Sequence, residues 1–472
     1  MLAITPTHWP VMEGRAVGLR ASLAVLERGG PLLLGRHGAA GSFYQIGGGE
    51  EGIFVYFPLL SRLFGVADPV SMVRYSYIVL FALSATIYPI VFYKLTHSQL
   101  AGLAAPAMLL VCVRSLGFDD IYWIPAWGAL TLLPLIYLLA RDWPRFGLLA
   151  LVGITLAAGW VSSVRANSGL AIAVPAAIVL LLRRWPLWRL LPGLALLILA
   201  YISINAFVFT AIREDRNHRM GNQVATALRR EQPSPHIWHT MYIGLGYLPN
   251  DYGIRYEDGV ANARVQRDAP GTGYLSARYD AVIRAAYFDV LGQHPLEVIK
   301  QYAAKIVAVT AETAPYLLIV LLTLPAMLLL GRDRRAAKRW ALLSLPAIVV
   351  GFLPAMIAIP VEPYEQGLYG VIGAMGIVGL CWVLGQLEAE IRIHGSIRPM
   401  LTVLRRARSS STDTRRNPVR LSIGISIAAL IAMCTLIVGG YFVNHSAERW
   451  QGYSSGVLVA TLHPDSHLPS QL

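Results

Sequence analysis

The stretch LWRLLPGLALLILAYISINAFV, residues 187–208, indicates the fold class of this chain. It contains a single charged side chain, Arg189. Because a helix needs about 17–25 mostly apolar residues to cross a bilayer, this stretch predicts a transmembrane helix. A polar segment, residues 210–310, follows it directly and separates it from the next apolar block.

The composition of the whole chain is that of a membrane protein. Of its 472 residues, 55% are hydrophobic and 14% are charged, whereas soluble proteins carry about 25% charged residues. The net charge of +13 does not indicate nucleic-acid binding, because the basic residues gather beside apolar stretches, in residues 332–339 and 392–420. Such clusters are typical of cytoplasmic loops and suit anionic lipid headgroups.

The predicted fold is therefore an all-α polytopic membrane protein with about ten transmembrane helices and a large extracytoplasmic loop. When the basic loops are placed in the cytoplasm, the sides of the other loops follow by alternation. The large loop and both termini then lie on the outer side of the cytoplasmic (inner) membrane. The ten candidate spans are 73–94, 99–116, 121–140, 146–163, 167–183, 187–208, 313–331, 340–361, 367–388 and 421–443.

This topology divides the chain into seven segments. In chain order they are an extracytoplasmic segment 1–72, a first helix block 73–208, the large extracytoplasmic loop 209–312, a second helix block 313–388, a basic cytoplasmic linker 389–420, the last helix 421–443 and an extracytoplasmic tail 444–472. Within the large loop, residues 276–307 predict two helices separated at Gln293-His294-Pro295.

The N-terminal segment shows a definite order of features. Residues 15–28 predict an amphipathic helix with Val17 and three leucines on its apolar face. A Gly-rich stretch, 29–52, comes next, and the run FPLLSRLFG, residues 57–65, leads into the first span. Together with the acidic Glu13 in front, this order resembles the first extracytoplasmic loop of the C-class integral membrane glycosyltransferases, which use polyprenyl-phosphate sugars as donors.

The resemblance implies a function and a catalytic residue. In that family a carboxylate after the first membrane helix acts as the base, so the resemblance assigns this role to Glu13. The chain departs from the family in that residues 1–12 do not contain the expected leading membrane helix, and Glu13 stands alone where the family carries an acidic pair. Capping of the amphipathic helix is the alternative role, since acids favour the first helical turn.

The same resemblance implies the partners. They are a polyprenyl-phosphate sugar and a glycan, lipid or protein acceptor. Membrane lipids as partners, and no nucleic acid, follow instead from the apolar spans and the basic clusters beside them. No cofactor is certain, and a divalent metal stays open.

Two turns on the extracytoplasmic side carry further candidates. Asp119 and Asp120 are a carboxylate pair suited to proton transfer or metal binding, with Asp120 as the second catalytic candidate; helix capping is the alternative. Arg165 stands in a turn with Asn167, where a cation breaks the positive-inside trend. Binding of a substrate phosphate is favoured there, and snorkelling to lipid headgroups is the alternative.

The large loop carries the candidates for sugar binding. His236 and His239 are spaced so that both can lie on one face of a helix. No zinc signature accompanies them, so a role in hydrogen bonding to substrate or in packing is favoured over a metal site. An outside hairpin, Glu362–Glu365, lies close enough to contribute acid groups. The remaining candidates are polar or aromatic groups suited to carbohydrate, with an ordinary folded turn as the alternative: Tyr242, Asn250, Asp251, Arg255 and Asp258.

The leading hypothesis is transfer of a sugar from a polyprenyl-phosphate donor on the outer face of the membrane. A polysaccharide ligase or polymerase that acts on diphosphate-linked glycans, using the loop His and Arg residues, is a second enzyme hypothesis. A transporter or flippase of lipid-linked glycans is the third. The sequence shows no internal repeat and places its charges at helix ends, which favours chemistry at the membrane surface.

Overall fold

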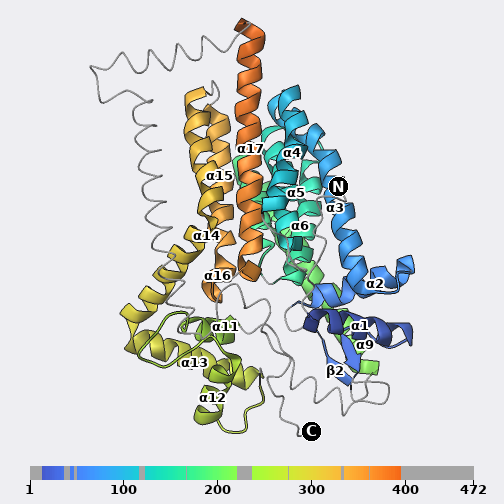
Figure 1. The fold of residues 1–472 in the computed structure, drawn as a ribbon, viewed down its shortest axis with the longest axis vertical. Coiled ribbons are helices and arrows are strands. Elements are labelled where there is room, and N and C mark those ends of the chain that lie inside the picture. The colour runs from blue at the N-terminus through green and yellow to red at the C-terminus, as the bar shows by residue number, and fades with distance from the viewer. Residues whose placement is uncertain are drawn as a thin grey trace.

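The computed structural model describes residues 13–36, 43–46, 50–115, 123–165, 167–219, 237–274, 276–330, 334–360 and 362–394. Within these ranges the regular secondary structure is helical apart from one small hairpin, which confirms the all-α fold class. Long apolar helices form a bundle, and the polar segments gather at one end of it (Figure 1).

The bundle is built around α17, Glu362–His394, which packs most extensively against α5, Trp123–Arg141. Gly370 makes this contact close, since a Cβ atom there would lie 2.4 Å from the carbonyl oxygen of Ala126. Small residues at such contacts let membrane helices approach each other. The other bundle helices are α3 Pro69–Thr96, α4 Gln99–Ser115, α6 Gly147–Val164, α7 Leu170–Leu182, α8 Leu187–Ser203 and α15 Arg334–Gly351.

Six of the described helices are long and apolar enough to cross a membrane. They cover 69–96, 123–141, 147–164, 187–219, 335–357 and 364–393. Large apolar side chains such as Leu103 and Leu149 remain exposed on the bundle, as expected of a surface that faces lipid.

The predicted number of ten spans is not confirmed. The helix α14, Pro295–Leu330, contains two arms bent by 80° that together make a seventh candidate. Pro315 stands at the bend, where its missing amide interrupts the helical hydrogen bonds. The helices α4 and α7 are apolar but shorter, and the predicted span 421–443 lies outside the described residues.

The N-terminal segment packs as a small unit against one end of the bundle. Its elements are α1 Glu13–Glu27, β1 Leu34–Arg36, β2 Phe43–Gln45 and α2 Glu51–Phe64, and the two strands pair antiparallel with Leu34 opposite Gln45. The apolar face of α1, including Leu19 and Leu23, is buried against the protein. Val17 is 53% exposed and therefore does not belong to that face.

The start of α3 is fixed by Asp68. Its carboxylate accepts a hydrogen bond from the amide of Ser71 at 3.0 Å, and Pro69 occupies the first helical turn. Partial burial raises the pKa of Asp68, but the hydrogen bonds from Ser71 and the charge of Arg20 outweigh it, so that the pKa lies below its ordinary value. The carboxylate thus stays charged at the helix N-terminus.

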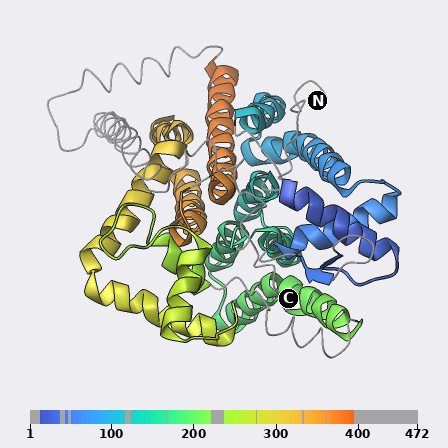
Figure 2. The same ribbon diagram turned by 60° about the horizontal axis from the view of Figure 1, so that its bottom comes forward.

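The large loop folds as helices at the same end of the bundle as the N-terminal segment (Figures 1 and 2). A π-helical segment, η2 Ile204–Phe209, connects α8 to α9 Thr210–Arg219. The loop then forms α11 Ile237–Gly244, α12 Asp258–Asp268 and α13 Ala277–Gln293, with a core that includes Leu245, Ile254 and Ile283. The predicted break at Gln293-His294-Pro295 is confirmed.

The buried Lys305 of α14 ties this loop to the bundle. Its amino group donates to the carbonyl oxygens of Met356 at 3.0 Å and Ala358 at 2.5 Å, at the end of the short helix α16, Leu353–Ile357.

Candidate functional site

The turn between α6 and α7 presents Arg165 at the end of the bundle next to the loop. Asn167 adopts a left-handed conformation with φ of 67°, which Asn tolerates better than most residues. The amide of Ser168 donates to the carbonyl oxygen of Arg165 at 3.2 Å, and the amide of Gly169 donates to Oγ of Ser162 at 2.9 Å. The predicted pair Arg165 and Asn167 therefore belongs to one ordered turn, in which Asn167 shapes the backbone.

Glu50 is the centre of the charged cluster around Arg165. Its Oε1 atom lies 2.6 Å from Nη1 of Arg165, and both of its oxygens accept hydrogen bonds from Arg15 of α1, at 2.9 and 3.1 Å. The three side chains are only 13–15% exposed. A carboxylate with two guanidinium partners in so little water is held ionised and in a fixed orientation.

A close backbone contact explains how Glu50 reaches Arg165. Gly52, in the first turn of α2, lies so near the end of α6 that a Cβ atom there would be 2.5 Å from Oγ and 2.8 Å from the carbonyl carbon of Ser163. Only glycine permits this approach. It brings Glu50 and the neighbouring Glu51 to the mouth of the α6–α7 turn.

Glu51 forms a second set of contacts with α9. Nε of Arg213 donates to Glu51 at 2.9 Å, and a second nitrogen of Arg213 contacts the other carboxylate oxygen. The guanidinium of Arg216 is fully buried near Glu51 and donates to Oδ1 of Asn217 at 3.2 and 3.1 Å. Among the described residues its Nη1 atom has no hydrogen-bond partner. A buried donor without a partner is costly and is suited to a ligand acceptor.

The pair Glu50-Glu51 is not among the residues predicted from the sequence. Two adjacent acids just before the apolar run of α2 are the signal that points to it. Their partners are distant in sequence, since Arg165 is 115 residues and Arg213 is 162 residues away. Four arginines, Arg15, Arg165, Arg213 and Arg216, and the two glutamates together carry an excess of two positive charges. We call them the arginine cluster.

Two tyrosines connect the arginine cluster to the large loop. The guanidinium of Arg165 lies 4.0 Å from the ring centre of Tyr364, in the predicted hairpin at the start of α17. The hydroxyl of Tyr364 lies 2.8 Å from that of Tyr256 in the loop. Burial raises the pKa of Tyr256 well above its ordinary value, and Tyr364 and Asp258 raise it further, whereas Arg165 lowers it. The structure thus places loop residues beside the turn of Arg165.

His239 lies at the centre of a hydrogen-bond network in the loop. Its Nδ1 atom is 2.8 Å from the hydroxyl of Tyr279, and its Nε2 atom is 3.0 Å from Oδ1 of Asp258. His239 is buried, whereas the side chain of Asp258 is 73% exposed. Burial, followed by the effects of Tyr274 and Asp258, raises the pKa of Tyr279. An imidazole between a phenol and an open carboxylate can move a proton toward solvent.

The other predicted loop residues lie apart from this network or stabilise the loop. Tyr242 is buried in the loop core, and this burial raises its pKa. Both ends of the side-chain amide of Asn250 form hydrogen bonds within its own turn. Its Oδ1 atom accepts from the backbone amide of Ile254 at 3.0 Å, and its Nδ2 atom donates to the carbonyl oxygens of Leu248 and Ile254. This geometry fits the alternative of an ordinary folded turn. Asp251 and Arg255 are exposed.

Several predicted residues cannot be placed. Glu13 is the first residue of α1, but its side chain is outside the described part of the chain. Asp119, Asp120 and His236 lie outside the described residues altogether. Within the part that the structure describes, no three His, Cys, Asp or Glu side chains are grouped to hold a metal ion.

The arrangement combines fixed cations, an open carboxylate with a proton relay, and aromatic side chains. It can hold an anion at the arginine cluster while Asp258 and His239 handle a proton nearby. No family model, curated protein or solved structure matches this chain.

Proposed function

We propose that this chain is a membrane glycosyltransferase that moves a sugar from a polyprenyl-phosphate donor to a glycan, lipid or protein acceptor. The observation that carries the proposal is the arginine cluster, in which partly or fully buried guanidinium groups gather at one end of a bundle of apolar helices. A lipid-linked phosphate requires this combination, because its prenyl chain lies in the bilayer and its phosphate lies at the surface.

The cluster supports departure of the lipid phosphate. In the transfer, the bond between the anomeric carbon and the phosphate oxygen breaks while a bond to the acceptor oxygen forms, and the phosphate leaves as an anion. Arg165 and Arg216 would stabilise that charge, and the role of Arg216 is supported by its buried Nη1 atom, which has no hydrogen-bond partner among the described residues. Fixed positive groups in a site with little water are effective for this purpose.

The acceptor proton requires a carboxylate. Glu50 is an unfavourable base because two guanidinium groups already share its oxygens. Asp258 is exposed and backed by His239, which suits it to receive a proton. Glu13 and Asp120 remain the carboxylates that the sequence predicts for the same role.

The proposal includes the predicted topology. With ten spans and the basic loops in the cytoplasm, the arginine cluster and the large loop face the outer side of the cytoplasmic membrane. A nucleotide sugar does not suit such a site, because in this topology the candidate groups face away from the cytoplasm.

The excess positive charge of the cluster also favours a second candidate. A ligase or polymerase acts on a diphosphate-linked glycan, which brings more negative charge to the site. His239 and Asp258 would handle the acceptor proton in this reaction equally well. The two candidates differ in the number of phosphates on the lipid.

Native mass spectrometry of the full chain tests both. The purified protein is offered polyprenyl-phosphate sugars and polyprenyl-diphosphate glycans, together with the variants Arg165→Gln and Arg216→Gln. Arg278→Gln, an exposed arginine of α13, is the control that removes the same charge. We expect the monophosphate donor to bind to the wild type and to the control, and binding to fall by about tenfold in the two variants. Binding of the diphosphate alone supports the ligase, and equal binding by all four proteins contradicts a role for the cluster.

A further inference from the structure

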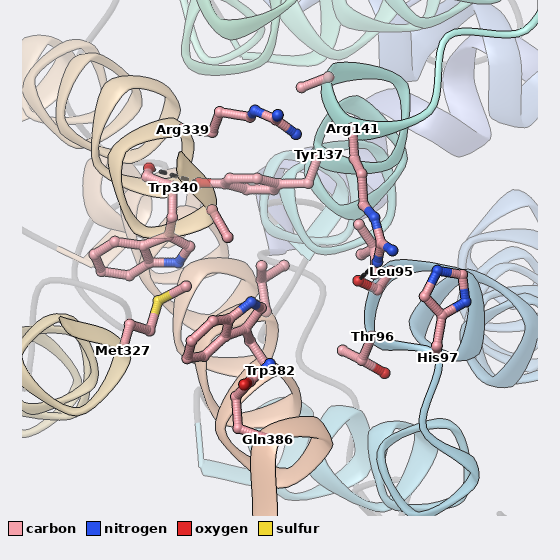
Figure 3. A pocket seen from close by; sticks show the side chains of 13 residues that line it. Leu95, Thr96, His97, Tyr137, Arg141, Met327, Arg339, Trp340, Trp382 and Gln386 are labelled. Carbon is pink, nitrogen blue, oxygen red and sulfur yellow. Dashed lines mark hydrogen bonds between the residues drawn. The ribbon is translucent and has the colours of Figure 1, made fainter. Parts of the chain in front are cut away.

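A second site lies at the end of the bundle opposite the large loop. A cavity of about 240 Å³ opens there between the ends of α3, α5, α14 and α17 and the beginning of α15 (Figure 3). Its volume is below the roughly 300–1,000 Å³ typical of pockets for drug-sized ligands, so it fits a small group such as one phosphate with its glycerol. This cavity lies at the other end of the bundle from the arginine cluster and shares no residue with it.

Two arginines line the cavity. Arg141, the last residue of α5, is held in place by donating to the carbonyl oxygens of Lys94 at 3.2 Å and of Leu95 at the end of α3. Arg339 of α15 lines the same cavity, and in the described part of the chain no carboxylate pairs with it. Arg183 is close enough for its charge to interact with that of Arg339. The exposed Asp142 lies 3.8 Å from Arg141.

The remaining walls are largely apolar and aromatic. Figure 3 shows Arg141 across the cavity from Trp340 and Trp382, with Met327 beside the two indole rings. The indole N–H of Trp340 donates to the carbonyl oxygen of Met375 at 3.3 Å, so this side chain offers the cavity only its apolar surface. A cavity with cations on one side and indole rings on the other suits an amphiphile with an anionic head.

We propose that this cavity binds the phosphate headgroup of an anionic phospholipid from the leaflet opposite the large loop. The phosphate lies between Arg339 and Arg141, and the glycerol and the first acyl carbons lie against Trp340 and Trp382. The position at the end of apolar helices favours a lipid over free phosphate, because indole and basic side chains at this depth meet headgroups. Binding offsets the mutual repulsion of the arginines and joins α5 to α15.

The test uses the full chain and native mass spectrometry with phosphatidylglycerol and phosphatidylcholine. Arg339→Gln removes the cation, and Ala336→Phe fills the cavity without a change in charge. Lys338→Gln is the matched control, since this exposed residue of the same helix does not line the cavity. We expect phosphatidylglycerol to bind the wild type and Lys338→Gln equally, and to bind both cavity variants about tenfold more weakly.

Three outcomes overturn the proposal. Equal loss in Lys338→Gln and Arg339→Gln means that the lipid responds to surface charge alone. Undiminished binding to a folded Ala336→Phe, with its melting temperature as the check, places the lipid elsewhere. Displacement of phosphatidylglycerol by millimolar inorganic phosphate identifies a free phosphate site instead of a lipid site.

Discussion

Replacing Glu50 with glutamine tests whether this carboxylate holds the arginine cluster together. Glu50 accepts three hydrogen bonds from Arg15 and Arg165, and all three side chains are 13–15% exposed. Breaking a fully buried pair costs about 3–5 kcal/mol. Because these groups keep some water and glutamine retains one acceptor oxygen, we expect the lower end, about 3 kcal/mol.

The expected effect is measurable as a shift in melting temperature. At about 2.1 cal/mol/K per residue, the 472 residues give an unfolding entropy of about 1 kcal/mol/K. A loss of about 3 kcal/mol therefore lowers the melting temperature by about 3 °C. The assay is thermal unfolding of the detergent-purified chain, followed by tryptophan fluorescence.

Two additions make this assay decisive. Glu27→Gln removes the same charge from an exposed position of α1 and is expected to change the melting temperature by less than about 1 °C. Phosphate is expected to restore part of the stability of Glu50→Gln, since it supplies the missing anion. Equal melting temperatures for Glu50→Gln and the wild type would show that Glu50 does not hold the cluster together.

Three further predictions concern the supports of the site. Gly52→Ala is expected to destabilise the chain by about 1–3 kcal/mol through overpacking against α6. Gly259→Ala, in open space on α12, should stabilise the chain by up to about 1 kcal/mol. The melting temperatures of the two variants, compared with that of the wild type, test both expectations. Tyr279→Phe leaves Nδ1 of His239 without its partner and should cost about 1–2 kcal/mol, and an unchanged melting temperature would show that the network is not formed. The charged carboxylate of Asp68 caps α3, and its pKa is lowered, so it stabilises the fold above the ordinary pKa of 3.8 and this stabilisation is lost as the pH falls through the lowered pKa. Asp68→Asn and the wild type should therefore become equally stable in acid. A difference in stability that persists there would contradict this.

The sequence predicts local structure in this chain better than long-range contacts. The apolar stretches and the break at His294 follow from hydropathy and proline chemistry, and the structure places helices there. The bend at Pro315 and the short helices α4 and α7 make the span count hard to predict, because length alone does not distinguish a full span from a partial one.

The candidate site could be predicted only in part. Arg165 is recognisable because the predicted topology places its turn outside, where a cation is unusual, and this signal depends on no residue distant in the sequence. Glu50 has no such local signal, since its role follows from packing against Arg15 and Arg165 through the close approach of Gly52. The hydrogen bond between Tyr256 and Tyr364 spans 108 residues and likewise depends on how the loop meets the bundle.

A structure of the full chain with a bound polyprenyl-phosphate sugar, determined by electron cryo-microscopy, would test the proposed donor site. We predict that the donor phosphate lies about 2.7–2.9 Å from guanidinium nitrogens of Arg165 or Arg216, with the sugar directed toward Asp258 and His239. A donor phosphate bound at the opposite end of the bundle, or between the helices away from the arginine cluster, would contradict the proposal.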